Sequence, residues 1–286
     1  MGEALRDAAV RLARAGVPSP QADAELLLGH VLEVSRGRVH VLAITGATLT
    51  AEQGDSLDAL VLRRCAREPL QHLTGRASFR GLELAVGPGV FVPRPETESV
   101  AQVAIDALRA APEPAPVAVD LGTGSGALAF ALAAEVPRAT VVGVENSPAA
   151  YVWTRQNLRD TGLTNARLVF ADLADALPEL DGTVAVVVSN PPYIPLGAVP
   201  RDPEVRLHDP AAALYGGEDG LDVVRAVSRT ALRLLRPGGV LVLEHGELQG
   251  ADIRALLAAD GWHGPATLPD LTGRPRTTTA TPGRPG

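Results

Sequence analysis

The chain has 286 residues, a formal net charge of −7 and 46% hydrophobic residues. These values exclude wholesale disorder, and the length is enough for one full-size domain with a smaller one. All 26 basic residues are Arg, which excludes chemistry that needs a lysine, such as a Schiff base or a P-loop. The net charge argues against a surface that wraps duplex nucleic acid.

Two further features bear on cellular location and metal binding. No segment approaches the run of about 18 apolar residues that a membrane span needs, and the N-terminus does not resemble a signal peptide. The single cysteine, Cys65, allows no disulfide within the chain and no cysteine-based metal cluster. We therefore expect a cytoplasmic protein without membrane contact and without a metal site.

Residues 1–75 are predicted to form a small helical domain. Ser19 before Pro20 is typical of a helix start, and Thr50 with Gln53 fits a capping box. A bundle of four short helices at this length is expected to depend on a neighbouring domain for part of its stability.

Residues 76–110 are predicted to connect this bundle to the rest of the chain. Residues 78–84 are typical of two short strands around a turn, and a helix is expected from Pro95 to about Arg109. The proline-rich residues 110–116 mark a surface connection.

In residues 111–286, short Val-rich runs alternate with helical patterns, which predicts a doubly wound α/β sheet. The tail from Arg274 is rich in Thr, Pro and Gly, and its last residues are expected to fray. The expected strands are residues 117–121, 140–145, 166–170, 184–189 and 240–245, and the expected helices are residues 126–135, 148–161, 220–235 and 249–259.

A glycine-rich loop follows the first of these strands, where residues 120–126 read Asp-Leu-Gly-Thr-Gly-Ser-Gly. Alternate glycines allow a tight turn and close approach of a ligand, and the N–H groups at the following helix start can meet its polar part. Glu145 ends the second strand, where it can accept hydrogen bonds from two ribose hydroxyls, and Asp172 follows the third as a candidate contact for an adenine amino group. Together these features predict a nucleoside-binding site at the switch point of the sheet.

The loop leaves two cofactors open. Gly122, Gly124 and Ala127 also satisfy a relaxed dinucleotide fingerprint, which allows NAD. Asp120 favours S-adenosylmethionine, because a carboxylate at this position can face the ligand's ammonium group, whereas it would repel a pyrophosphate.

The fourth strand runs into Asn190-Pro191-Pro192-Tyr193, a turn that two prolines stiffen. The Asn190 side-chain oxygen and the Pro191 carbonyl can accept both N–H bonds of a planar NH₂ group, on which the Tyr193 ring can stack. An amide or aryl-amine nitrogen is a poor nucleophile because its lone pair is delocalised. Acceptors placed for a pyramidal nitrogen stabilise the transition state of its methylation. These four residues are the predicted catalytic and substrate-binding residues.

At these motifs the sequence resembles the HemK-type (PrmC-like) protein-(glutamine-N5) methyltransferases, which modify peptide chain release factors. The Pro-Arg-Pro-Glu-Thr-Glu segment at residues 93–98 is the most specific part, whereas Asn-Pro-Pro-Tyr also occurs in adenine-N(6) and other amino-methyltransferases. The matching segments cover nearly the whole chain and are residues 24–28, 67–75, 79–81, 92–98, 120–126, 190–193, 214–221 and 270–274.

The resemblance implies a Rossmann-like, S-adenosylmethionine-dependent methyltransferase domain behind a helical bundle that helps to receive the release factor. It implies methylation of the glutamine in the Gly-Gly-Gln loop of class I release factors, in translation termination, by a monomer with no nucleic-acid partner. The residues implied to bind the cofactor are Asp120, Gly122, Thr123, Gly124, Ser125, Gly126, Glu145, Asp172, Leu173 and Asn190.

Four positions depart from the family pattern. Glu145 replaces the Asp of many relatives, and Leu173 stands where a bulky aromatic can flank the adenine. Ala211 stands where the family has Arg, and His245 stands where a small or apolar residue is usual. A lone histidine of this kind is expected to be structural.

Two other functions are weaker interpretations. An adenine methyltransferase acting on nucleic acid would explain the glycine loop and the proline turn, but it needs a path for a flipped base, usually lined by Lys or Arg and aromatic residues. A cofactor-binding scaffold or sensor would explain the loop but not the turn.

Overall fold

The computed structural model describes residues 1–283 and divides into two compact units. The helical unit consists of Met1–Arg76 together with Pro200–His208, and the sheet unit consists of Ala77–Val199 and Asp209–Gly286. The helical unit thus contains a segment from far along the chain.

Helices account for nearly all regular structure of the helical unit, as predicted from the sequence. The Thr50–Gln53 capping box is confirmed, with reciprocal hydrogen bonds of 3.2 and 3.0 Å at the start of α4. Ser19 does precede the first residue of α2, but its side chain makes no capping hydrogen bond, so Pro20 alone carries that predicted start signal. The helices are α1 (Gly2–Arg14), α2 (Pro20–Leu32), α3 (Arg36–Ile44), α4 (Ala51–Cys65), α5 (Leu70–Thr74) and α9 (Pro203–His208).

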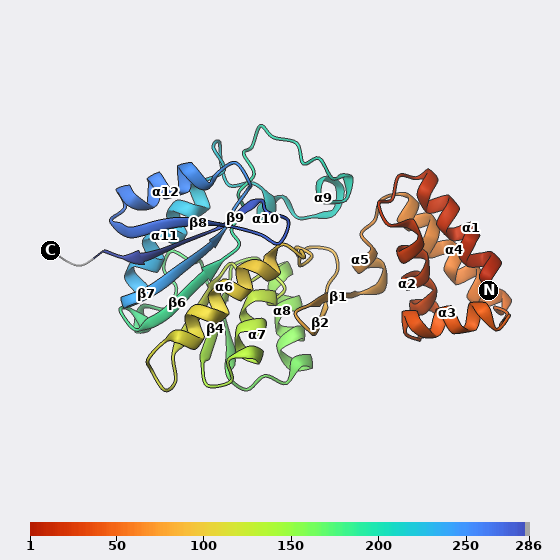
Figure 1. The fold of residues 1–286 in the computed structure, drawn as a ribbon, viewed down its shortest axis with the longest axis horizontal. Helices are drawn as coiled ribbons and strands as arrows, with labels where there is room; N and C mark the ends of the chain where they lie inside the picture. The colour runs from red at the N-terminus through yellow and green to blue at the C-terminus, as the bar shows by residue number, and fades with distance from the viewer. Residues whose placement is uncertain (284–286) are drawn as a thin grey trace. The chain divides into compact units, whose positions relative to one another are not determined.

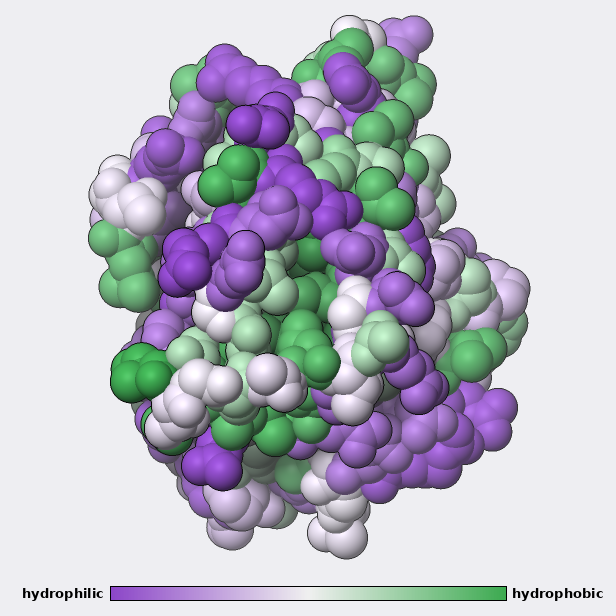
Figure 2. Space-filling view, turned by 90° about the vertical axis from the view of Figure 1, so that its right-hand side faces the viewer, coloured by the Kyte–Doolittle hydropathy of each residue, from purple (hydrophilic) through white to green (hydrophobic). Residues whose placement is uncertain are grey.

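Apolar side chains from α1, α2, α3 and α4 form the core of this unit. Cys65 belongs to the partly buried residues around that core, in keeping with a packing role. Figure 2 views the side of Figure 1 on which α1 to α4 are drawn, and hydrophobic residues in green lie there among hydrophilic residues in purple. The central buried residues are Leu5, Leu12, Leu27, Leu28, Val39, Leu57 and Val61.

The predicted hairpin and linking helix are both present. Strands β1 (Arg76–Phe79) and β2 (Leu82–Ala85) pair around Arg80 and Gly81, whose φ angles are +46° and +77°. Two successive left-handed residues match the right-handed twist of the paired strands. Helix α6 follows at Thr97–Ala110.

The remainder of the sheet unit is a seven-stranded sheet with the order β5-β4-β3-β6-β7-β9-β8. The five predicted strands are parallel to one another where they pair, and β9 is antiparallel to both β7 and β8. The strands are β3 (Val117–Leu121), β4 (Thr140–Glu145), β5 (Ala166–Phe170), β6 (Val184–Ser189), β7 (Leu235–Glu244), β8 (Trp262–Pro269) and β9 (Pro275–Pro282).

Helices cover both faces of the parallel part of the sheet, so the predicted doubly wound α/β architecture is confirmed (Figure 1). One core lies under α6, α7 and α8, and a second lies under α11 and α12. Central strands buried on both faces read as continuous Val-rich runs, which is why the sequence identified them. The helices of this part are α7 (Ala127–Glu135), α8 (Pro148–Thr161), α10 (Ala211–Leu214), α11 (Asp222–Leu234) and α12 (Gly250–Ala259), with a short 3₁₀ turn at Pro178–Leu180.

The C-terminal region differs from expectation. Residues expected to be an irregular tail form β9, which lies between β7 and β8. The predicted fraying concerns the last residues, of which 284–286 lie outside the described part of the chain. Across residues 1–283, no helix combines the length and apolar character needed to cross a bilayer.

Candidate active site

The predicted site residues of the sheet unit gather at one edge of the sheet. Four neighbouring strands, in the order β5-β4-β3-β6, are parallel and end at this edge. Glu145 is the last residue of β4, the glycine loop follows β3, and Asn190 follows β6 directly. The chain leaves β3 to one side for β4 and returns on the other side as β6, which makes this the topological switch point where α/β sheets bind ligands.

The glycine loop has the backbone conformation that its sequence predicts. Gly122, Gly124 and Gly126 have φ angles of +77°, +58° and +89°, a region that disfavours other residues. A Cβ atom added at Gly122 or Gly124 would meet nothing within 4 Å, whereas one at Gly126 would lie 2.1 Å from the Phe130 ring. The first two glycines therefore leave space against the backbone, and the third allows the helix to pack.

Neighbouring elements fix this loop in place. The Gly124 N–H donates to Glu145 Oε2 at 2.8 Å, and Asn157 Nδ2 of α8 donates to the Ser125 carbonyl at 2.9 Å. The Thr154 hydroxyl, also of α8, donates to the Gly124 carbonyl. The loop is thus pre-formed by β4 and α8.

Asp120 is buried beneath the loop. Its Oδ2 accepts hydrogen bonds from the Thr123 hydroxyl at 2.6 Å and from the Ala129 N–H at 3.1 Å. Its Oδ1 is buried and has no hydrogen-bond partner among the described residues. Burial raises the pKa of Asp120 to about 7, and these two hydrogen bonds oppose the rise. One oxygen therefore supports the loop, and the other is the candidate contact for a cationic group.

The two carboxylates predicted to hold the nucleoside also organise the backbone around them. Glu145 Oε1 accepts from the N–H groups of Asn146 and Ser147 at 3.0 and 2.8 Å. Asp172 is exposed, and its Oδ2 accepts from Asn146 Nδ2 at 3.3 Å. Leu173, which follows it, is partly buried against the second core. Each carboxylate oxygen has a second lone pair, so both groups retain acceptor capacity toward a ribose or an adenine.

The Asn-Pro-Pro-Tyr turn packs on the loop that precedes α11. A Cβ atom at Gly216 would lie 2.4 Å from the Pro192 carbonyl oxygen, and one at Gly220 would lie 2.3 Å from the Tyr193 carbonyl oxygen. Gln249 Nε2 donates to that same Tyr193 carbonyl at 2.9 Å. The glycines of the 214–221 segment therefore allow two backbones to meet and hold the turn rigid.

Polar and charged side chains from distant segments surround the turn. Asn190 Nδ2 donates to the Thr97 hydroxyl at 3.4 Å. Burial raises the pKa of Tyr193 to about 12, with a further contribution from the negative charge of Glu244. The Tyr193 phenol is therefore neutral at physiological pH, and its ring is available for stacking.

Sequence reasoning missed two residues at this edge, Thr97 and Glu244. Thr97 lies in the segment at 93–98, which was used only as a family marker, and it is the first residue of α6. Glu244 ends β7, the strand beside β6, and is 1% exposed. A carboxylate at a strand end was the signal that identified Glu145, and the same signal could have identified Glu244.

One of the departures from the family pattern, His245, has a structural explanation. His245 is fully buried, and its ring nitrogens lie 2.9 Å from the Thr278 hydroxyl and 2.8 Å from the Gly246 carbonyl. Burial lowers its pKa, so the expected structural role is supported. In the His-Asp-Pro-Ala segment that contains Ala211, the Asp209 carboxylate accepts from Arg94 Nη2 at 2.6 Å.

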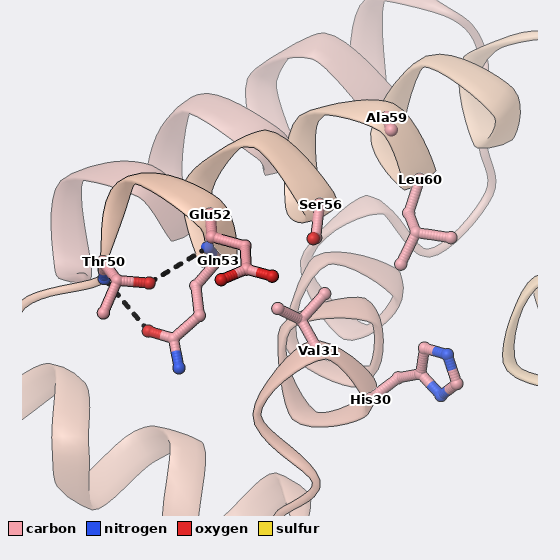
Figure 3. Close-up of a pocket in the computed structure, with 8 residues that line it drawn as sticks. All are labelled: His30, Val31, Thr50, Glu52, Gln53, Ser56, Ala59 and Leu60. Atoms are coloured by element: carbon pink, nitrogen blue, oxygen red, sulfur yellow. Dashed lines mark hydrogen bonds between the residues drawn. The ribbon is translucent and has the colours of Figure 1, made fainter.

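A separate open pocket lies in the helical unit between the end of α2 and the start of α4 (Figure 3). The polar atoms of Thr50 and Gln53 there are used by the capping box. Within residues 1–283, no group of three or more His, Cys, Asp or Glu could hold a metal ion. The pocket is lined by His30, Val31, Thr50, Glu52, Gln53, Ser56, Ala59 and Leu60.

The residues present fit S-adenosylmethionine. The open space above Gly122 and Gly124 admits a ligand against the backbone, and Glu145 stands beside that space with acceptor capacity for ribose hydroxyls. Asp120 Oδ1 is free to accept from an ammonium group, and the positive charge of that group would favour the ionised form of this buried carboxyl against the effect of burial.

Comparison with known proteins agrees with this reading. Residues 3–75 match the family described as the PrmC N-terminal domain, and residues 113–260 match a methyltransferase domain. The chain is 52% identical to the release factor glutamine methyltransferase of Streptomyces coelicolor, with 96% of each chain covered. It is also 44% identical to the 4-amino-L-phenylalanine/4-methylamino-L-phenylalanine methyltransferase of Streptomyces pristinaespiralis, covering 91% of this chain and 88% of the relative.

A solved structure supports the fold alone. The methyltransferase from Pyrococcus furiosus superposes with a TM-score of 0.50 and 19% identity, covering 79% of this chain and 98% of that one.

Proposed function

The chain belongs to the family of release factor glutamine methyltransferases, and from that premise we propose that it methylates the side-chain amide nitrogen of the glutamine in the Gly-Gly-Gln loop of class I peptide chain release factors. The single observation that carries the proposal is the rigid Asn-Pro-Pro-Tyr turn beside the glycine loop at one sheet edge, in a chain whose relatives are named for this reaction. The proposal places the protein in the cytoplasm, where release factors act.

The cofactor of this family is S-adenosylmethionine, which supplies an electrophilic methyl group when bound. In our proposal, Gly122 and Gly124 allow it to lie against the backbone, and Glu145 accepts from its ribose. Asp120 balances its ammonium charge, while Asp172 and Leu173 flank the adenine.

The substrate amide is held by acceptors of the turn. Asn190 Oδ1 and the Pro191 carbonyl accept its two N–H bonds, and the Tyr193 ring stacks on its plane. These acceptors are pre-organised by the packing of the turn on Gly216 and Gly220. They stabilise the pyramidal nitrogen of the transition state more than the planar ground state, which raises the rate. The methylated nitrogen then loses one proton to solvent and needs no strong general base.

The 44% identical relative makes an aryl amine a second candidate substrate. An aryl-amine nitrogen is also delocalised and planar, so the same turn could hold it. The comparisons favour a release factor because relatives at 52% and 48% identity are named for that substrate. They likewise favour a protein substrate over the nucleic-acid adenine that the sequence left open.

The test is a methyl-transfer assay on purified class I release factor and, separately, on 4-amino-L-phenylalanine, with the methyl group located by mass spectrometry. We expect methylation of the Gly-Gly-Gln glutamine and no turnover of the amino acid. Asn190→Ala should lower the rate about 10²–10³-fold, by analogy with loss of one oxyanion-hole donor. Its melting temperature should stay near that of the wild type, and the two rates are compared at saturating S-adenosylmethionine because Asn190 is also implied to contact the cofactor. Methylation of 4-amino-L-phenylalanine without methylation of the release factor would show that the substrate is the aryl amine and that the proposal is wrong.

A further inference from the structure

A buried carboxyl group lies behind the Asn-Pro-Pro-Tyr turn. Ser189 of β6 is in register with Leu243 of β7, so the next residues along, Asn190 and Glu244, are neighbours at the sheet edge. Glu244 is 1% exposed, and its Oε2 has no hydrogen-bond partner among the described residues. Burying an ionisable group in this way is costly, and nothing in the proposed mechanism yet uses it.

Three side chains from three elements form a connected polar cluster at this point. The Glu244 carboxyl group is hydrogen-bonded by the side chains of Thr97 and Asn190. Asn190 Nδ2 in turn donates to the Thr97 hydroxyl at 3.4 Å. Thr97 is buried at the start of α6, so it is fixed by packing rather than free to rotate toward solvent.

The charged surroundings of Glu244 come from several elements. Glu96, which precedes α6, raises the pKa of Glu244, whereas Arg276 of β9 lowers it. Tyr193 lies on the turn itself, and the negative charge of Glu244 raises the pKa of its phenol. His245, next along the strand, is occupied with Thr278 and Gly246. Burial raises the pKa of Glu244 to about 7, against the lowering effects of Thr97, Arg276 and Asn190.

We propose that Glu244 and Thr97 are positioning residues that orient the Asn190 amide, with Nδ2 toward Glu244 and Thr97 and Oδ1 toward the substrate nitrogen. The proposal rests on the proposed function, in which Asn190 Oδ1 is one of the two acceptors of the substrate amide. An asparagine amide presents an acceptor on one side and two donors on the other. If the Asn190 amide flipped, its N–H group would face the substrate N–H, and the site would lose the Oδ1 acceptor.

The ionised form of Glu244 is the one that enforces the required orientation. A carboxylate only accepts hydrogen bonds, so it takes the Thr97 hydroxyl hydrogen and leaves the Thr97 oxygen to accept from Asn190 Nδ2. A protonated carboxyl group can instead donate its hydrogen to the Thr97 oxygen. The Thr97 hydroxyl hydrogen can then point toward Asn190, which allows the Asn190 amide to flip. The rate of methyl transfer is therefore expected to depend on the ionisation of Glu244.

The experiment compares five variants with the wild type, on intact release factor at saturating S-adenosylmethionine, and two of them are Asn190→Ala alone and Asn190→Ala combined with Glu244→Gln. Glu244→Gln and Thr97→Val should each lower kcat about 10–100-fold with little change in KM, whereas Thr97→Ser, which keeps the hydroxyl, should stay close to wild type. The wild-type kcat should rise as the pH increases through about 7, and that rise should be absent in Glu244→Gln. In an Asn190→Ala background, Glu244→Gln should cause no further loss, because its effect passes through Asn190.

Two outcomes would overturn the inference. One is a Glu244→Gln variant with the kcat and pH profile of the wild type. The other is an undiminished effect of Glu244→Gln in the Asn190→Ala background. Thermal denaturation of each variant reports whether the protein is folded, independently of turnover and of cofactor binding. A wild-type protein with no activity on release factor would instead contradict the proposed function, so the two failures are distinguishable.

Discussion

At the scale of single residues, two buried carboxyl groups link the stability of the protein to pH. The pKa of Asp120 and that of Glu244 are each raised to about 7, chiefly by burial. In the folded state these groups keep protons that the unfolded chain releases at lower pH. They therefore lower stability progressively as the pH rises from about 4 to about 7. His245 acts in the opposite direction, because burial lowers its pKa and the unfolded chain binds the extra proton.

A Glu244→Gln variant isolates one of these contributions. It removes a group whose pKa rises from its ordinary value of 4.5 to about 7 on folding, which corresponds to a penalty of about 3 kcal/mol at most above pH 7. Its free energy of unfolding should therefore increase relative to the wild type between pH 5 and pH 8. Urea denaturation of the wild type and the variant at pH 5 and at pH 8 measures this difference. His245 is present in both proteins, so its contribution cancels. A difference that stays constant or decreases with pH would contradict a raised pKa for Glu244. The same variant is expected to be slower in methyl transfer, so stability and activity would change in opposite directions.

At the scale of secondary-structure elements, the sequence predicted the parts whose signals are local. Central strands such as β6 are continuous apolar runs, and the glycine loop and the proline turn are contiguous motifs. Strand β9 was missed because residues 275–282, which are rich in Thr with Pro at each end, carry no hydrophobic pattern, and its partners lie on both sides of it in the sheet. The polar cluster of Thr97, Asn190 and Glu244 was missed for a related reason. Its members come from three segments that only the fold brings together.

The strand–loop–helix element around the glycine loop gives a test with a matched control. Gly122 and Gly126 both have positive φ angles, but only a Cβ at Gly126 would meet the Phe130 ring, at 2.1 Å. Ala at either position strains the backbone, and Ala at 126 also overpacks the core. Gly126→Ala should therefore lower the free energy of unfolding by about 1–3 kcal/mol more than Gly122→Ala.

Chemical denaturation of both variants measures that difference, and calorimetry measures their affinity for S-adenosylmethionine. We expect Gly122→Ala to lose affinity out of proportion to its loss of stability, because its methyl group would occupy the open space above the loop. Equal stability of the two variants would show that the helix tolerates displacement of Phe130.

At the scale of the whole molecule, the segment Pro200–His208, which follows the Asn-Pro-Pro-Tyr turn, belongs to the helical unit. Within that unit, Glu204 accepts hydrogen bonds from Arg67 Nη2 at 2.9 Å and lies 2.8 Å from Arg64 Nη2. The Arg64 guanidinium is also 2.7 Å from Asp23, and its side chain is 4% exposed. Partly desolvated arginine–carboxylate pairs of this kind are stronger than surface ion pairs.

This connection makes deletion of the helical unit a poor test of its function. The segment Pro200–His208 begins seven residues after Tyr193 and ends beside Asp209, whose partner Arg94 lies in the 93–98 segment. A chain without residues 1–75 would leave Glu204 without its two arginine partners. Loss of activity in such a chain would not distinguish substrate recognition from collapse of this segment.

A single substitution separates these effects. Glu204→Gln weakens both arginine pairs while keeping the helices and their core. If the helical unit positions the release factor through this segment, kcat/KM on intact release factor should fall about 10-fold, because misplacement of a substrate costs rate even far from the reacting atoms. Turnover of a short Gly-Gly-Gln peptide and the affinity for S-adenosylmethionine should be unchanged, because neither is expected to use the helical unit.

Glu68→Gln is the matched control: it breaks a pair with Arg63, whose side chain is 54% exposed, and should leave all three quantities near wild type. An equal loss on peptide and on intact release factor would show that the segment supports the Asn-Pro-Pro-Tyr turn itself rather than recognition of the protein substrate.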